Sequence, residues 1–156
     1  NNAAILNTDL KSTSTAWKAI LQDGSFVAPG TEGTLKFDYS AAPAAGTPNF
    51  YISTTIENKQ TDEAHHGAKD FGSLTAKAGV TIPDILKALA LFPNTAKTGR
   101  GYFYMRNMGE RLLYRGGSFG NGAAAGEAYG NLNSPRSLSS AALGLFSAYV
   151  DPALYL

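Results

Sequence analysis

Residues 115–146 read RGGSFGNGAAAGEAYGNLNSPRSLSSAALGLF, and Gly, Ala, Ser and Asn dominate this stretch. A segment made only of such small side chains buries too little apolar surface to offset the entropy lost on ordering, and it stays disordered. This stretch differs from a flexible Gly/Ser linker because larger residues recur along it. They are Phe119, Tyr129, Leu132, Leu138 and Leu143. We therefore expect a long ordered segment that these residues anchor to a core.

Ordered loops of this length inside a compact domain are usually functional. If the anchors face the core, the small side chains between them face solvent, and a rigid scaffold then presents an exchangeable binding surface. A loop that merely covers the core is the alternative. Composition does not separate the two.

The rest of the composition excludes several classes of protein. The chain has 156 residues, which suits one domain, and 44% of them are hydrophobic, enough for a core. The net charge of +1 gives no concentrated basic face for nucleic acid or an anionic membrane. Without cysteine there is no disulfide, thiolate metal site or cysteine nucleophile. The longest apolar run, IPDILKALALF, is too short to insert across a membrane.

Short strands separated by turns dominate the pattern. Asp23-Gly24 stands between two apolar runs, which predicts a hairpin of residues 17–21 and 25–28. Residues 15–22 also fit a helical spacing, so a helix there is the competing interpretation. Further strands are expected at 34–39, 50–56, 101–106, 111–115 and 143–150.

One helix and two long loops complete the expected elements. Pro83 in a first turn, followed by an apolar face that ends before Pro93, predicts a helix at 83–92. Prolines and glycine make 41–49 a loop, and the polar stretch 57–70 is expected to be an exposed loop.

The polar N-terminus, rich in Thr and Ser, starts with Asn rather than Met. We expect residues 1–15 to be an arm or linker from a longer chain, followed by a single domain at 16–156.

A metal site is not favoured by the histidines. His65 and His66 stand beside Asp62 and Glu63, and imidazole and carboxylate groups are metal ligands. Adjacent side chains on a loop usually point apart, and no further ligand follows at a defined spacing. We expect a solvated loop, with no metal and no cofactor.

Catalytic motifs are also lacking. The glycine-rich stretches 99–101 and 116–120 are not followed by the Lys-Ser/Thr of a phosphate-binding loop. Ser118 does not stand in a nucleophile-elbow pattern. Nothing in the sequence indicates that Glu110 and Glu127 meet as an acid–base pair. We therefore expect a protein that is not an enzyme.

Arginines and tyrosines remain as structural or binding candidates. Guanidinium groups brace loop carbonyls or pair with acids such as Glu110 and Glu127, and this structural role is expected for Arg106, Arg111, Arg115 and Arg136. A tyrosine offers sugar or protein a flat apolar face and a hydroxyl, as Tyr102, Tyr104 and Tyr129 would. For Tyr102 and Tyr104, which alternate in a strand, core packing is an equal alternative.

The C-terminal third carries four short motifs in a fixed order: Arg115-Gly116-Gly117-Ser118-Phe119, Asn131-Leu132-Asn133, Pro135-Arg136-Ser137 and Gly144-Leu145-Phe146. This order resembles the variable proteins of phage and prophage diversity-generating retroelements, which share the C-type-lectin fold of formylglycine-generating enzymes. Their motifs read Arg-Gly-Gly-Ser-Trp, Asn-Leu-Asn, Ala-Arg-Ser and Gly-Phe-Arg. The upstream stretches WKAILQDGSFVAPGTEGTLK and IPDILKALALFP also resemble phage members.

Two departures from that family stand out. The last motif lacks its arginine, so Phe146 has to pack in its place. Several positions at which relatives carry diversifiable Asn hold other residues here: Gly120, Ala124, Ser134, Leu138, Ser140 and Ala142. The catalytic members of the wider group bind copper through cysteines, which this chain lacks.

The resemblance implies an α+β fold of the C-type-lectin type, with short twisted antiparallel strands, one or two helices and long ordered loops. It implies a non-catalytic virion protein on the phage particle surface, a receptor-binding module of a tail fibre or head fibre. The alternative is a structural virion protein, a capsid decoration or fibre-joining module, whose loops contact neighbouring subunits. A calcium-dependent lectin is disfavoured because clustered acidic ligands are lacking.

The expected binding residues lie on the outward side of 119–142, with Glu127 and Tyr129 as the larger contacts. They are Phe119, Gly120, Asn121, Ala124, Glu127, Tyr129, Ser134, Leu138, Ser140 and Ala142. The expected structural residues are Arg115, Gly116, Gly117 and Arg136. The expected partners are a host-surface protein or glycan, or neighbouring virion subunits. Since each small residue contributes little, several copies would act together in a homo-oligomer such as a trimer.

Overall fold

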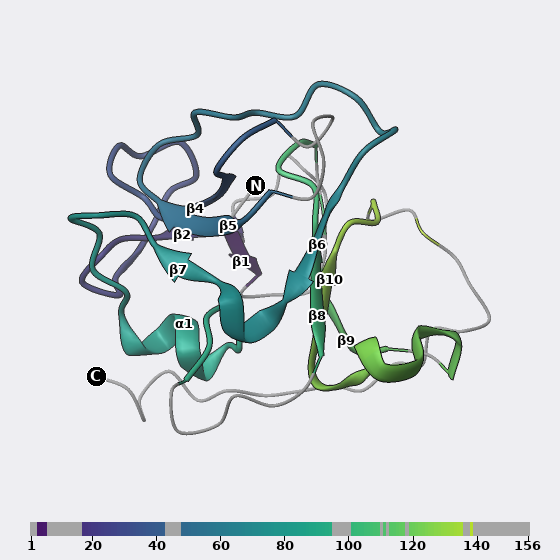
Figure 1. The fold of residues 1–156 in the computed structure, drawn as a ribbon. Helices are drawn as coiled ribbons and strands as arrows, with labels where there is room; N and C mark the ends of the chain where they lie inside the picture. Colours follow the sequence, from purple (N-terminus) through teal and green to yellow (C-terminus); the bar gives the residue numbers. More distant parts are fainter. Residues whose placement is uncertain are drawn as a thin grey trace.

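The computed structural model describes residues 3–5, 17–42, 48–94, 101–109, 111, 113–117, 119–135 and 138. Within these ranges the chain forms three small β-sheets, one α-helix and short 3-10 helices, an α+β content (Figure 1). The strands are β1 (Ala3–Ile5), β2 (Trp17–Ile20), β3 (Phe26–Val27), β4 (Lys36–Tyr39), β5 (Phe50–Ser53), β6 (Gly67–Asp70), β7 (Thr75–Ala76), β8 (Tyr102–Met105), β9 (Tyr114–Gly116) and β10 (Gly126–Leu132). The helices are η2 (Phe71–Ser73), α1 (Asp84–Ala88) and η3 (Phe119–Ala124).

The expected N-terminal hairpin is confirmed, and the competing helix is not formed. β2 and β3 pair antiparallel, with Ile20 opposite Phe26. The Asp23 carboxylate closes the turn by accepting hydrogen bonds from the backbone N–H of Ser25 at 2.9 Å and from its hydroxyl. β1 pairs with the other side of β2, so residues 3–5 of the expected arm add a strand to this sheet.

The second sheet has the order β4-β5-β7, with β4 antiparallel and β7 parallel to β5. Three consecutive side chains of β4, Phe37, Asp38 and Tyr39, are buried, so both faces of this strand are covered. Phe37 packs on the hydrophobic core, whereas Asp38 accepts hydrogen bonds from the loop after β5. The polar stretch 57–70 is therefore not simply an exposed loop. Part of it packs over β4, and its last four residues form β6.

The third sheet has the order β6-β8-β10-β9. The strands β8 and β9 were expected on either side of a turn, and in the structure β10 lies between them, parallel to β8 and antiparallel to β9. The expectation of antiparallel strands is thus wrong for two pairs, β8–β10 and β5–β7. β10 can lie close to β8 because Gly130 has no side chain. A Cβ at this position would lie 2.6 Å from the Phe103 ring.

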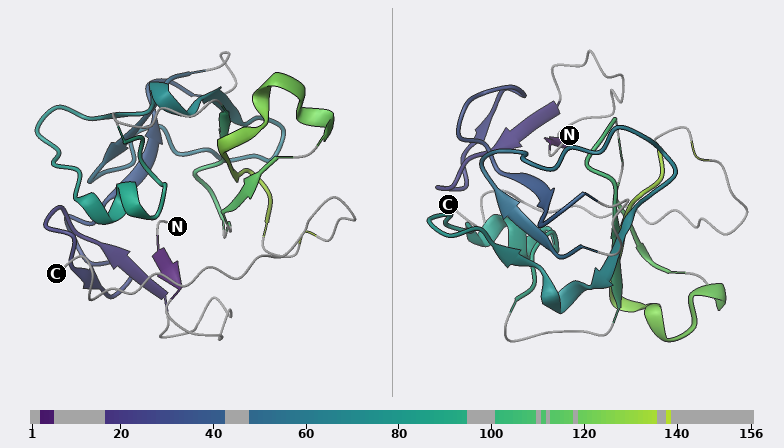
Figure 2. Two further views of the ribbon diagram at one scale, coloured as in Figure 1. Left: turned by 90° about the horizontal axis from the view of Figure 1, so that it is seen from below. Right: turned by 45° about the horizontal axis from the view of Figure 1, so that its top comes forward.

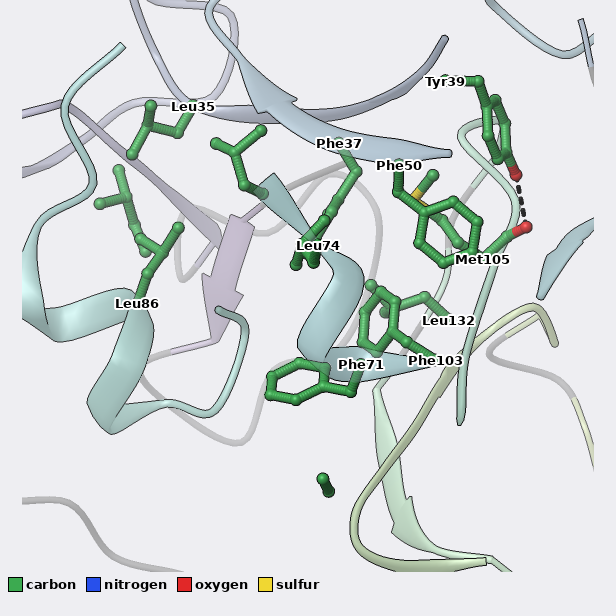
Figure 3. Packing of buried hydrophobic residues seen from close by; sticks show 13 residues of the cluster. Leu35, Phe37, Tyr39, Phe50, Phe71, Leu74, Leu86, Phe103, Met105 and Leu132 are labelled. Carbon is green, nitrogen blue, oxygen red and sulfur yellow. Dashed lines mark hydrogen bonds between the residues drawn. The ribbon is translucent and has the colours of Figure 1, made fainter. Parts of the chain in front are cut away.

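The hydrophobic core fills the space between the second and third sheets and extends under α1 (Figure 3). Phe103 of β8 is at its centre and is fully buried. Its ring centroid lies 5.4 Å from Phe37, 5.7 Å from Phe71 and 6.2 Å from Phe50. Aromatic side chains contribute more burial per residue than any others, so this cluster holds the two sheets at a fixed relative position.

The helix is shorter than the sequence indicates. It was expected at 83–92 and ends at Ala88, and Ala90 adopts a left-handed backbone with φ of 51°. The N–H groups of Leu91 and Phe92 then turn back to the Leu86 carbonyl, at 2.8 and 3.2 Å. This turn lets the apolar side chains after the helix reach the core that Leu86 already contacts. The expected strand at 143–150 lies outside the described residues.

Candidate ligand-binding face

The four-stranded sheet has one face toward the core and one face away from it. Seen from below, α1 and the second sheet lie on one side of it and η3 lies on the other (Figures 1 and 2). Along β8, Phe103 and Met105 are buried in the core, so the alternation of a strand places Tyr102 and Tyr104 on the opposite face. Of the two interpretations of this tyrosine pair, core packing is therefore wrong.

Tyrosines from three strands meet on this outward face. The Tyr104 ring lies 6.2 Å from Tyr102 and 5.5 Å from Tyr129 of β10, and Tyr129 lies 6.5 Å from Tyr114 of β9. The His66 imidazole, just before β6, lies 6.0 Å from Tyr104. We call these five side chains the tyrosine face. Tyr114 was not predicted as a site residue, and His66 was not expected beside the tyrosines; the signals available in the sequence were the places of both residues in or next to strands.

Exposure differs along the tyrosine face. Tyr102 is 42% exposed, His66 is exposed, and Tyr104 and Tyr114 are half-buried. Tyr129 is only 3% exposed, so the expectation that it is a large outward contact is wrong. Its ring lies between those of Tyr104 and Tyr114, and its hydroxyl accepts a hydrogen bond from the Asn131 side-chain amide at 3.2 Å. Tyr129 therefore supports the exposed rings from within the sheet.

The tyrosine face is largely uncharged at neutral pH. Burial raises the pKa of the Tyr104 and Tyr114 hydroxyls, so both stay protonated. Burial, and secondarily the positive charge of Arg106, lowers the pKa of His66 from its ordinary value of 6.5. Its imidazole is therefore neutral at pH 7, and the ring can act as a flat, polar aromatic group.

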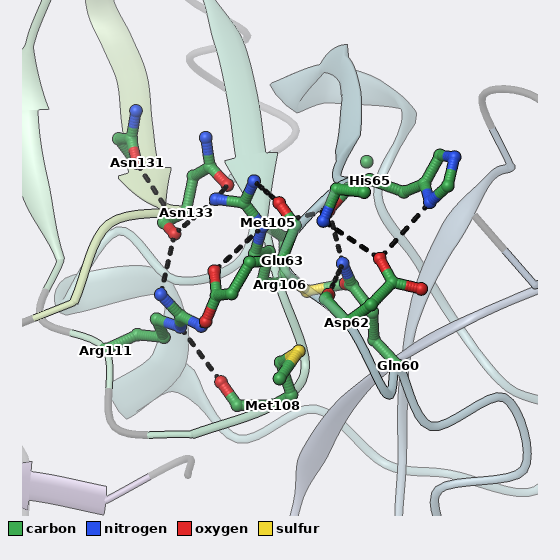
Figure 4. Close-up of polar contacts among 12 residues, drawn as sticks. Gln60, Asp62, Glu63, His65, Met105, Arg106, Met108, Arg111, Asn131 and Asn133 are labelled. Atoms are coloured by element: carbon green, nitrogen blue, oxygen red, sulfur yellow. Dashed lines mark hydrogen bonds and ion pairs between the residues drawn. The ribbon is translucent and has the colours of Figure 1, made fainter. Parts of the chain in front are cut away.

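A network of arginines fixes the loop that carries His66 (Figure 4). Arg106 donates to the carbonyl of His65 at 2.9 Å and to that of Asn133 at 3.0 Å, and it pairs with Glu63. Arg111, which is buried, donates to the carbonyls of Met108 at 2.9 Å and Asn133 at 3.1 Å, and it also pairs with Glu63.

The network joins the loop before β6 to the segment after β10. Bracing of carbonyls was expected for Arg106 and Arg111, and Glu63 is an acid that pairs with both of them. Glu110 and the Glu127 side chain lie outside the described part of the chain. Since most of the guanidinium N–H groups are engaged, these arginines position backbone and leave little donor capacity for a ligand.

The Arg-Gly-Gly motif shapes the start of the small-residue stretch. Arg115 donates to the carbonyls of Ala128 at 3.2 Å and Tyr129 at 3.3 Å, reaches the Ala90 carbonyl, and lies over the Phe71 ring at 5.3 Å. Gly116 and Gly117 then take φ values of 94° and 70°, which side chains rarely adopt. These contacts fit the structural role expected of the motif, while Arg136 lies outside the described residues.

The small-residue stretch is not one solvent-facing loop. η3 precedes β10, and the middle of the stretch is the central strand of the sheet, with Ala128, Gly130 and Leu132 buried. Among the expected contacts, Gly120 and Leu138 are exposed, and Asn121, Ala124 and Ser134 are half-buried. The structure describes only the backbone of Phe119 and Glu127, and Ser140 and Ala142 lie outside the described residues.

The histidine pair is held by local contacts. His65 Nδ1 lies 3.2 Å from Asp62 Oδ1, and this hydrogen bond lowers the pKa of Asp62. No group of three His, Cys, Asp or Glu side chains that could hold a metal occurs in the described part of the chain. None of the helices described there is long and apolar enough to cross a membrane. No protein-family model matches this chain, and no curated protein matches it in sequence.

Proposed function

We propose that this chain is a non-catalytic recognition module that binds its ligand on the tyrosine face. The observation that supports this most directly is the continuous set of aromatic rings on a sheet face that points away from the core. Contiguous exposed apolar surface marks interaction sites, and tyrosine is enriched where proteins bind.

The protonation state of the tyrosine hydroxyls favours binding over catalysis. Hydroxyls whose pKa is raised are poor nucleophiles and poor bases at neutral pH, as for Tyr104 and Tyr114. The face is instead held rigid within the sheet, since Asn131 donates to the Tyr129 hydroxyl and accepts from the Asn133 backbone N–H at 2.7 Å. A rigid aromatic surface loses little entropy when it binds.

The sequence resemblance extends the proposal to a biological setting. We place the fold among C-type-lectin-like folds and the protein on the surface of a phage particle, as a receptor-binding module of a tail or head fibre that acts as a homo-oligomer. Two features support this proposal: the Arg115-Gly116-Gly117 motif stands at the end of β9, before η3, and Asn131-Leu132-Asn133 stands at the end of β10, where Asn133 accepts from the arginine network.

A structural virion protein remains the second candidate because small exposed residues border the face. Gly120, Gly122 and Ala123 are exposed in η3, and small side chains permit close contact between neighbouring subunits. In that case the tyrosine face would be covered permanently by another copy or another virion protein.

Binding of the labelled protein to a panel of intact bacterial cells tests the proposal. Tyr102→Ala and Tyr104→Ala should each reduce cell binding several-fold, since they remove exposed ring surface without opening the core. Ile56→Ala is the matched control, because it removes a similarly exposed apolar side chain from the loop after β5. Circular dichroism verifies folding of each variant. Binding that the tyrosine variants leave unchanged would contradict the proposal, and loss of oligomerisation instead of cell binding would favour the structural role.

A further inference from the structure

The register of β6 against β8 places two more side chains beside the tyrosine face. Ala68 is opposite Tyr104 and Asp70 is opposite Tyr102. Directly opposite residues of an antiparallel pair share a face, so both lie next to these rings. Ala68 is too small to cover the Tyr104 ring. Asp70 is exposed and accepts a hydrogen bond from the Gly72 backbone N–H at 2.8 Å through one oxygen, Oδ1.

We propose that a neutral sugar chain binds here, with pyranose rings stacked on Tyr102 and Tyr104 and a sugar hydroxyl donating to Asp70. This assignment rests on the proposed function and names the ligand class of that same face. A pyranose has an apolar C–H face and a rim of hydroxyls, which matches an aromatic ring beside a hydrogen-bond acceptor. The carboxylate oxygen Oδ2 of Asp70 provides that acceptor, because only Oδ1 is used in capping η2.

The charge of the face selects a neutral ligand. Among the described residues, the register of β6 against β8 brings one charged group beside the Tyr102 ring, the Asp70 carboxylate, which repels phosphate, sulfate and acidic sugars. Single-stranded nucleic acid also stacks on aromatic rings, but it requires a basic groove along its backbone. The nearest guanidinium group of the network, Arg106, already donates to three carbonyls and to Asn133 Oδ1 and pairs with Glu63.

The arrangement of the rings suits a ligand with repeated units. Tyr102, Tyr104 and His66 follow one another at centroid distances of 6.2 and 6.0 Å, with rings tilted by 41° and 38°. Each ring therefore offers a separate platform, and one extended chain can contact several of them. No deep pocket is required at this site, because stacking on a sheet face needs only exposed rings.

The proposal is tested by titrating the purified protein with neutral hexasaccharides of glucose, mannose, galactose and N-acetylglucosamine, followed by NMR with labelled tyrosine. EDTA is present throughout to exclude calcium-dependent binding. At least one probe should shift the Tyr102 and Tyr104 ring signals. Tyr102→Ala should weaken that binding about 5- to 100-fold, the order found for stacking of flat rings on aromatic side chains. Tyr102→Trp should retain it.

Asp70→Asn tests the acceptor without removing the helix cap, since an asparagine oxygen also accepts from the Gly72 N–H. It should weaken sugar binding about tenfold, whereas Asp84→Asn, at an exposed carboxylate on α1, should have no effect. Preferential binding of an acidic polysaccharide, or sugar binding that Tyr102→Ala leaves intact, would overturn the assignment. If no sugar binds but cells are still bound in a Tyr102-dependent way, the sugar assignment fails and the proposed function stands. If neither is bound, both fail.

Discussion

A buried carboxylate in β4 provides the sharpest test of how this fold is held together. Asp38 is fully buried, and its two oxygens accept five hydrogen bonds. Oδ1 accepts from the backbone N–H groups of Tyr39 at 2.8 Å and Asn58 at 3.1 Å and from the Asn107 amide at 3.2 Å. Oδ2 accepts from the Glu57 N–H at 2.6 Å and from the Tyr51 hydroxyl at 3.3 Å.

The substitution Asp38→Asn keeps the shape of the side chain and places an NH₂ group against a donor. In the less costly orientation the new amide nitrogen replaces Oδ2, and the Tyr51 hydroxyl can turn to accept from it. The Glu57 N–H cannot, so the hydrogen bond from this part-buried backbone donor to a charged acceptor is lost. Such a loss costs about 1.5–3 kcal/mol, and relief of the buried charge offsets part of it. We expect a net loss of about 2 kcal/mol in the free energy of unfolding.

Urea unfolding, followed by circular dichroism at pH 7, measures this change. The expected loss corresponds to a decrease in Tm of about 4–8 °C for a chain of this size. Glu32→Gln is the control, since it removes the same charge from an exposed position, and it should change stability by less than about 0.5 kcal/mol. A loss below about 0.5 kcal/mol for Asp38→Asn as well would refute the idea that this carboxylate ties the loop after β5 to β4.

Three further changes test other parts of the fold. Gly130→Ala should destabilise the protein by about 1–3 kcal/mol, because its Cβ would lie 2.6 Å from the Phe103 ring, and Phe103→Leu should reduce that penalty in a double-mutant cycle. Arg115→Lys should cost about 1–2 kcal/mol in chemical unfolding, since an ammonium group cannot bridge the carbonyls of two segments as the guanidinium does. Burial raises the pKa of Tyr39 to about 12, above its unfolded value of 10, so its stabilising contribution is present below pH 10 and is lost as the pH rises to 12. Between pH 9 and pH 11 this residue should account for a loss of about 1 kcal/mol, which urea titrations of Tyr39→Phe should not show.

Local signals in the sequence predicted the elements that depend on local interactions. The Asp23-Gly24 turn, the alternating run of β4 and the aromatic runs of β5 and β8 all form where the pattern indicates them. In each case the residues that decide the conformation are neighbours in sequence, as with the Asp23 carboxylate and Ser25. The helix was overestimated because the apolar pattern continues to Phe92, while the backbone turns after Ala88 to bring that pattern onto the core.

Contacts between distant segments were not predictable in the same way. The sequence GEAYGNL of β10 has few residues that favour strands, and its place in the sheet comes from the fit of Gly130 against Phe103 and from the Arg115 bonds to its carbonyls. The buried role of Asp38 likewise depends on donors 19 or more residues away in sequence, among them Asn107.

At the candidate site, too, local features were predictable from the sequence and contacts between distant segments were not. That Tyr102 and Tyr104 share one side of a strand follows from their spacing, but which side faces the core depends on the partner sheet. Asp70 and His66 were assigned to a loop, so their places beside the tyrosines were not foreseen. Tyr129 was expected both to anchor the small-residue stretch to a core and to be an outward contact, and it is buried, so the first expectation is confirmed and the second is wrong. The small residues around it let β10 pack closely on both of its neighbouring strands.

The burial of β10 changes what the small residues can contribute to recognition. A residue such as Gly130 cannot be exchanged freely, because any added side chain meets the Phe103 ring. Exposed positions, which can vary without disturbing the core, occur in the segments before and after the strand, as at Gly120 in η3 and at Leu138. The tyrosine face itself is fixed by the sheet. If the tyrosine face binds the ligand as we propose, the sheet would hold the aromatic surface that contributes affinity, and exposed positions such as Gly120 could be exchanged to adjust specificity.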